Sequence, residues 1–259
     1  MRIIDFTHQQ PSPVRTQLFE HYFSYWGKRK TREIPAYETE RIQQSRVLIS
    51  SRLPYIQRAF SENGFALDKI DLVLMIGQGT SNGHAIIEDD RALVWIPLEA
   101  YSTERQVGVF LTHEIVHGLH YLSRPEYFFH THEEKNHLGR QLMTEGVALY
   151  VTKTLMSFSA EDALWADYIP EAECMVWMNA CVQEQPALRT FMREHWNDID
   201  GLALDLFFAN DPDDIYRYRA GYFIALSIIE SIVATRGLDL QALLATPRTQ
   251  LEEWCLSTL

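Results

Sequence analysis

Two histidines and a glutamate stand close together near the middle of the chain, in the segment His113-Glu114-Ile115-Val116-His117. In a helix, about 100° of rotation per residue places His113, Glu114 and His117 within an arc of roughly 100°. The apolar residues of the same stretch fall on the opposite side, at Leu111, Ile115, Leu119 and Leu122. The pattern predicts a helix with one face in the core and the other carrying two imidazoles and a carboxylate.

Such a face suits a zinc ion. Neutral imidazole nitrogens bind zinc at about 2.0 Å, and a catalytic zinc site has three protein ligands and one position left for water. Zinc lowers the pKa of that water toward neutrality. His113 and His117 are therefore candidate ligands of one Zn²⁺ ion, and Glu114 is a candidate general base. Because the motif is short and arises by chance in some chains, its context has to support it.

A third candidate ligand is Glu145, in the segment Thr144-Glu145-Gly146-Val147-Ala148. It falls in the middle of an apolar stripe at helical spacing, formed by Leu138, Leu142, Leu149 and Met156. Burying an ionised carboxylate costs several kcal/mol unless a cation or hydrogen-bond donors compensate. A zinc ion would compensate Glu145. The alternative is that Glu145 pairs with an arginine elsewhere, or lies in water at a boundary between lobes.

His-Glu-x-x-His followed by Glu-Gly-x-Ala on a later helix resembles the gluzincin group of metallopeptidases, particularly its uncharacterised bacterial predicted zinc proteases, over roughly residues 84 to 230. The resemblance implies a zinc metallopeptidase acting on a peptide or protein substrate. His113, His117 and Glu145 would then be the ligands. Glu114 would take a proton from the zinc-bound water and deliver it to the leaving amine. A zinc-binding protein with a structural metal and a partner-binding cleft, and a zinc hydrolase of a non-peptide amide or ester, remain open.

A tyrosine is the second catalytic candidate. The segment Tyr218-Arg219-Ala220-Gly221 is similar to the Tyr-x-x-Gly segment with which some gluzincins place a phenol against the developing oxyanion, which implies this role for Tyr218. Tyr216 and Tyr222 compete for it, and packing between helices is an equal alternative in a chain with 12 tyrosines. The oxyanion tyrosine thus stays open among the three.

The match to the gluzincins has departures. Between His117 and Glu145 lie 27 residues, more than in the best known gluzincins. Leu149 stands where thermolysin-like enzymes carry an aspartate, so the groups that orient the imidazoles are undetermined. The Gly-x-Met-Glu-Asn segment of the large aminopeptidases is not visible, and exopeptidase specificity is not transferred. The strand Ala92–Pro97 resembles the edge strand along which gluzincins bind extended peptides, with an ordinary sheet strand as the alternative.

Other polar residues near the motif receive no role. His120 lies about 10.5 Å along the helix axis from His113, too far for both to bind one zinc. The third histidine of the metzincins is replaced by Ser123. Arg217 and Arg219 could hold a substrate carboxylate, but surface positions are expected for both. A solvated loop is expected for the three spacer histidines, His130, His132 and His137.

The strands and helices that the sequence predicts around these residues indicate an α+β fold. Short apolar runs at 72–76, 85–87 and 92–96 indicate a small mixed or antiparallel sheet just before the zinc-binding helix. Helical periodicity covers 14–26, 37–60, 104–122, 136–157, 171–195 and 213–235, followed by a short pair after Gly237. We expect one metallopeptidase-like unit over 1–259, with sub-lobes 1–123 and 124–259, the second mainly helical.

The composition and charge of the chain disfavour some classes of partner and some locations. Lys and Arg total 23 against 35 Asp and Glu, a formal charge of −12, which disfavours nucleic acid and anionic lipid as partners. No apolar run approaches the roughly 20 residues that cross a bilayer, and the first residues lack a secretory pattern, so we expect a soluble cytoplasmic protein. Cys174, Cys181 and Cys255 do not form a disulfide framework and are expected to be buried. The oligomeric state is not predicted.

Overall fold

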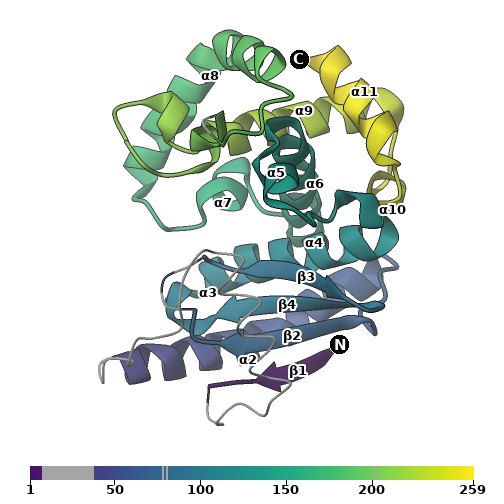
Figure 1. The fold of residues 1–259 in the computed structure, drawn as a ribbon. Helices are drawn as coiled ribbons and strands as arrows, with labels where there is room; N and C mark the ends of the chain where they lie inside the picture. Colours follow the sequence, from purple (N-terminus) through teal and green to yellow (C-terminus); the bar gives the residue numbers. More distant parts are fainter. Residues whose placement is uncertain (8–37, 78, 80, 202) are drawn as a thin grey trace.

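The computed structural model describes residues 1–7, 38–77, 79, 81–201 and 203–259 (Figure 1). Its four strands form one mixed sheet in the order β1-β2-β4-β3. β1 (Arg2–Asp5) pairs parallel with β2 (Ile70–Met75), β2 pairs parallel with β4 (Arg91–Pro97), and β3 (His84–Glu88) runs antiparallel to β4. The predicted α+β class with a small sheet is confirmed, and the sheet is mixed.

The three predicted apolar runs are β2, β3 and β4. Alternate side chains of a strand point to opposite faces of the sheet, and in this sheet buried side chains lie on both faces. On β2, Leu72 belongs to the main core and Val73 to a smaller core on the other face; on β4, Val94 and Trp95 divide in the same way. Strands covered on both faces read as continuous apolar runs, which is why the sequence revealed them.

Of the two possibilities for Ala92–Pro97, an edge strand like that of the gluzincins or an ordinary sheet strand, the structure shows the ordinary strand. β4 has a strand on each side, β2 and β3, and the edge nearest the predicted zinc helix is β3. β3 precedes β4 in the chain, and the turn at Asp89, where φ is 55°, returns β4 to the inner side of β3. Each strand's pattern is local, whereas the order of strands depends on which pairs bury the most apolar surface. β1, with only four residues, was not predicted.

Helices make up most of the remaining described chain. Their bounds are α2 (Glu38–Glu62), η1 (Leu98–Ala100), α3 (Glu104–Gln106), η2 (Val107–Leu111), α4 (Thr112–Ser123), η3 (Pro125–Tyr127), α5 (His132–Asn136), α6 (Leu138–Met156), α7 (Ala160–Trp165), α8 (Glu171–Glu194), η4 (Ala203–Phe207), η5 (Ile215–Arg217), α9 (Ala220–Arg236), α10 (Leu240–Leu244) and α11 (Arg248–Thr258). η2 is a π-helical turn, and the other η segments are 3₁₀ turns. In the ranges that the structure describes, no helix is both long enough and apolar enough to span a bilayer.

The predicted helices agree with these bounds at most positions. The helix expected over 14–26 lies outside the described residues. The helix expected over 213–235 begins only at Ala220, because Arg219 adopts a left-handed backbone with φ 61°, which interrupts the α-helical hydrogen-bond pattern. The cysteines Cys174, Cys181 and Cys255 are free and buried, as expected.

α4 lies between the sheet and the C-terminal helices (Figure 1). Gly118 lets it lie directly on β4, since a Cβ at this position would be 3.0 Å from the Cβ of Ala92 and 3.3 Å from Cγ2 of Val94. The other side of α4 packs against α6. The main core therefore contains residues from both 1–123 and 124–259.

Candidate metal centre

The polar face of α4 meets α6 at His113, His117 and Glu145. The Nε2 atoms of the two histidines are 3.0 Å apart. Oε2 of Glu145 lies 3.1 Å from Nε2 of His113 and 3.6 Å from Nε2 of His117. The structure therefore brings together three residues that the sequence singled out from two separate helices, and their ligand atoms all lie within 4.8 Å of one another.

These distances fit a metal ion. Ligand atoms at about 2.0–2.1 Å from a tetrahedral zinc are about 3.3–3.4 Å apart, and the three measured separations of 3.0, 3.1 and 3.6 Å bracket that value. Both imidazoles present Nε2 to the same point as the carboxylate oxygen. The group can hold a metal ion, and two imidazoles with one carboxylate are donors that zinc accepts.

The electrostatic environment acts differently on the two histidines of the group. The side chains of His113, His117 and Glu145 are only 10%, 6% and 15% exposed. Burial lowers the pKa of His113, which favours the neutral imidazole. Burial alone would also lower the pKa of His117, but the charge of Glu145 and the hydrogen bond with it raise that pKa, which favours the protonated ring. Burial by itself would raise the pKa of Glu145, but the charge of His117 and the hydrogen bond from His113 outweigh it and lower that pKa. In the described part of the chain the ion-pair partners of Glu145 are these histidines and no arginine or lysine.

Glu114 is buried beside the ligands. Burial raises its pKa to about 7; the charge of Glu145 acts in the same direction, and that of His117 opposes it. The start of the edge strand lies against this side chain, because a Cβ at Gly83 would be 2.4 Å from Cγ and 3.0 Å from Oε1 of Glu114. Gly83 was not singled out from the sequence. The available signal was a glycine next to a predicted strand, because such a glycine often marks a place where another group approaches the backbone closely.

The three candidate tyrosines lie in different surroundings. The Tyr218 ring packs on Trp165 at 5.2 Å between centroids, and its carbonyl accepts a hydrogen bond of 2.6 Å from Trp177. Tyr216 packs against Phe191. Burial raises the pKa of Tyr222, and the charges of Glu145 and Glu114 raise it further. The carboxylates of Glu145 and Glu114 thus act electrostatically on Tyr222, which makes it a candidate beside Tyr218, the residue that the motif implied.

The comparisons with known proteins identify no relative of this chain. The chain matches no family model, no curated protein and no solved structure. Membership of the gluzincins therefore stays a prediction from the two motifs and from the way their residues converge in this chain.

The two arginines beside Tyr218 differ. Arg217 is exposed and pairs with Asp205 at 3.6 Å and Asp211 at 3.5 Å, as expected of a surface residue. Arg219 turns inward, where its Nη2 donates a 2.8 Å hydrogen bond to the carbonyl of Leu164. The surface position expected for Arg219 is wrong, because the left-handed turn before α9 redirects its side chain.

The other histidines stay outside the centre. Among the residues that the structure describes, His113, His117 and Glu145 form the one group with metal-binding spacing. His120 is buried with its ring 4.0 Å from that of Tyr127, and burial lowers its pKa to about 3, so it is neutral. His130 and His132 are exposed, and Nδ1 of His137 accepts from the backbone N–H of Arg140 at the start of α6.

The orientation of His117 comes from packing. Its Nδ1 is buried and has no hydrogen-bond partner within the described ranges. The ring of Tyr121 stacks on the imidazole, with 5.6 Å between centroids. Leu149, which replaces the orienting aspartate of thermolysin-like enzymes, is buried and apolar. An aromatic contact thus restrains this ring where a carboxylate does so in other zinc sites.

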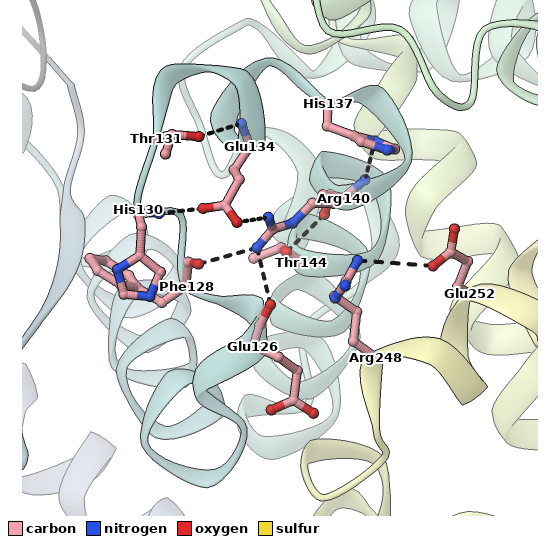
Figure 2. Close-up of polar contacts among 10 residues, drawn as sticks. All are labelled: Glu126, Phe128, His130, Thr131, Glu134, His137, Arg140, Thr144, Arg248 and Glu252. Atoms are coloured by element: carbon pink, nitrogen blue, oxygen red, sulfur yellow. Dashed lines mark hydrogen bonds and ion pairs between the residues drawn. The ribbon is translucent and has the colours of Figure 1, made fainter.

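The long spacer between the two motifs is held to α6 by Arg140 (Figure 2). Its Nη1 lies 2.8 Å from Oε1 of Glu134, and its Nη2 donates to the carbonyls of Glu126 at 3.0 Å and Phe128 at 3.1 Å. Glu134 also accepts a 2.6 Å hydrogen bond from the backbone N–H of His130. One buried guanidinium therefore fixes the backbone of the spacer at the first turn of the helix that carries Glu145.

Replacing Arg140 tests this anchor. Arg140→Leu removes hydrogen bonds from a charged donor, so the free energy of unfolding is expected to fall by about 1.5–3 kcal/mol. Urea unfolding followed by circular dichroism measures the change. Arg248→Leu is the matched control, because Arg248 lies 4.0 Å from Glu252 and both side chains are about one-third exposed; it should cost less than about 1 kcal/mol. Equal losses in the two variants would contradict the assigned role.

Proposed function

We propose that the protein is a zinc-dependent metallopeptidase that hydrolyses bonds of a peptide or protein substrate. The observation that carries the proposal is the convergence of His113, His117 and Glu145 with separations of 3.0–3.6 Å. The buried Glu114 beside them supplies the base that a hydrolytic centre requires. A site of three ligands also favours catalysis over a structural role, because structural zinc sites have four protein ligands.

Each residue of the proposed centre has a separate role. His113, His117 and Glu145 would hold the ion. When bound, zinc supplies a Lewis acid that polarises a carbonyl and acidifies water. Glu114 takes the proton of the attacking water and passes it to the leaving amine, and a pKa of about 7 suits a group that must both accept and donate near neutral pH.

A phenol completes the proposed centre. The raised pKa of Tyr222 keeps its hydroxyl protonated, and a protonated hydroxyl can donate a hydrogen bond to the oxygen that gains charge in the transition state. Tyr222 is our first choice for this role and Tyr218 the second. Of the variants Tyr222→Phe and Tyr218→Phe, the one that removes the acting hydroxyl is expected to lower kcat and leave the metal content unchanged.

Gly83 supplies a test of how Glu114 is positioned. Gly83→Ala places a methyl group in contact with Cγ of Glu114, which forces the carboxylate to shift. Because a displacement of about 1 Å can cost 10²-fold in rate, kcat is expected to fall by roughly that factor while the zinc content stays constant. Gly108→Ala is the control, since its Cβ would meet the end of the Phe158 ring at 3.2 Å, away from the centre. An unchanged kcat in Gly83→Ala would remove Gly83 from the site.

Two measurements test the proposed function itself. Elemental analysis of the purified protein should find one zinc per chain. Peptide libraries assayed beside small amides and esters should show cleavage of peptides. Zinc with turnover of small amides or esters only would support the non-peptide hydrolase, and stoichiometric zinc with a fourth protein ligand and no turnover would support a structural site.

A further inference from the structure

Tyr101 connects the segment after β4 to the loop that leads into β3. Its side chain is fully buried, and its hydroxyl donates a hydrogen bond to the carbonyl of Asn82. Asn82 immediately precedes Gly83, whose backbone lies against Glu114. A Cβ at Gly83 would be 2.4 Å from Cγ and 2.9 Å from Cδ of that glutamate. The Tyr101 hydroxyl therefore holds the loop one residue before its contact with the proposed base.

The backbone around Tyr101 is itself fixed. On one side, the carbonyl of Ala100 accepts a 2.6 Å hydrogen bond from the hydroxyl of Tyr168. On the other side, the backbone N–H of Ser102 donates to the side chain of Gln106 at 2.8 Å. Gln106 belongs to α3, which continues through η2 into α4 without a break. Tyr101 is thus tied to the same helical segment that carries the proposed base.

Glu99 holds the loop at its other end. Its Oε2 accepts a 3.1 Å hydrogen bond from the backbone N–H of Gly77, and its Oε1 accepts one of 3.1 Å from that of Gly79. Hydrogen bonds to an ionised carboxylate are stronger than those between neutral groups. Two anchors on one segment, Glu99 near β2 and Tyr101 near β3, therefore set the position of the loop relative to α4.

We propose that Tyr101, assisted by Glu99 at the other end of the loop, is a positioning residue for the general base. Its hydrogen bond keeps Gly83 in place, and Gly83 limits where the Glu114 carboxylate can lie. A base must lie within hydrogen-bond reach of the proton that it accepts, and a displacement of about 1 Å can cost 10²-fold in rate. Tyr101 acts through the loop and takes no part in the proton transfer. The inference rests on the proposed function and deepens it.

Tyr101→Phe removes the hydroxyl and keeps the ring, so it isolates this hydrogen bond. We expect kcat to fall about 10-fold, because the loop loses one of its anchors and the base is displaced by less than about 1 Å. KM and zinc content should stay constant. Tyr127→Phe is the matched control, since Tyr127 is also buried and its hydroxyl donates to the carbonyl of Thr246 at 3.2 Å, between η3 and the start of α11. It should lower the melting temperature comparably and leave kcat unaltered, whereas equal kcat in the two variants overturns the inference.

Combining Tyr101→Phe with Gly83→Ala tests the route through the loop. Changes that act through one contact have non-additive effects. Glu114 is already displaced in the Gly83→Ala protein, so Tyr101→Phe should lower kcat much less there than in the wild type. Effects that multiply show another route and overturn the inference. Where Tyr101→Phe does not fold, Glu99→Gln carries the test, because it loses one of the two acceptors at the other end of the loop: kcat should fall several-fold, and an unchanged kcat overturns the inference.

A readout independent of hydrolysis separates this inference from the proposed function. Crystal structures of the wild type and the variants, grown in the presence of zinc, compare the position of the Glu114 carboxylate. It should shift or lose defined density in Tyr101→Phe and stay in place in Tyr127→Phe. An unmoved carboxylate overturns the inference. A shifted carboxylate in a protein that cleaves no peptide leaves the positioning role and removes the peptidase, whereas peptide cleavage with unaltered kcat in Tyr101→Phe leaves the peptidase and removes the inference.

Discussion

Glu114→Gln is expected to abolish peptide hydrolysis while zinc remains bound at one ion per chain. Glutamine has nearly the same shape and fits beside Gly83, but its amide neither accepts the proton of the attacking water nor returns it to the leaving amine. General acid–base catalysis contributes about 10²–10⁴-fold, and kcat should fall by at least that factor. The ligands His113, His117 and Glu145 are unchanged, so metal affinity should vary little.

The measurement combines steady-state kinetics with elemental analysis of the same preparation. Glu133→Gln is the matched control, because Glu133 is exposed on α5 and the substitution makes the same change in charge away from the centre. It should retain wild-type kcat. A Glu114→Gln protein with full activity would contradict the mechanism, and one that has lost its zinc would show that Glu114 supports the ligands and would leave its catalytic role without evidence.

Glu145→Ala is expected to lose most of the bound zinc. It removes the single carboxylate among the three ligand groups and leaves two imidazoles whose Nε2 atoms are 3.0 Å apart. Loss of a group that merely orients a ligand costs about 10–100-fold in metal affinity, so loss of a direct ligand should cost more than about 100-fold. Hydrolysis should disappear at limiting zinc and return in part when zinc is added in excess.

Competition titration with a chelator of known affinity measures this loss. Glu230→Ala is the control, since Glu230 pairs with Lys153 at 2.7 Å, with both side chains about one-third exposed, and should leave zinc affinity unaltered. In the wild type, removing the metal with a chelator should abolish activity, and equimolar zinc should restore it. Unchanged zinc affinity in Glu145→Ala would place the ion elsewhere and end the case for this centre.

Much of the ligand set could be predicted because helical periodicity is local. The spacing of His113 and His117 places both imidazoles on one face whatever the rest of the chain does. The apolar stripe around Glu145 likewise predicted an inward position for this carboxylate, whose side chain is 15% exposed on a helix that is buried on most sides. The continuous apolar runs revealed β2, β3 and β4, because strands covered on both faces need apolar side chains at every position.

The partner of each helix could not be predicted in this way. α6 lies against α9 because Gly146, the residue after Glu145, permits close approach: a Cβ there would be 2.8 Å from the carbonyl oxygen of Ala225. In the pair Glu145-Gly146, the glutamate is thus the proposed metal ligand and the glycine is the packing contact with α9. The glycine is visible in the sequence, but the segment that approaches it lies nearly 80 residues away along the chain.

Three assignments around the centre depended on the tertiary structure. Strand order placed β3 at the edge and β4 inside, the approach of Gly83 to Glu114 needed both elements in place, and the left-handed turn before α9 sent Arg219 inward. The sequence by itself determined which side chains share a face of one element, because backbone geometry repeats over a few residues. Only the folded chain decided which faces meet, since that depends on packing between segments far apart in sequence.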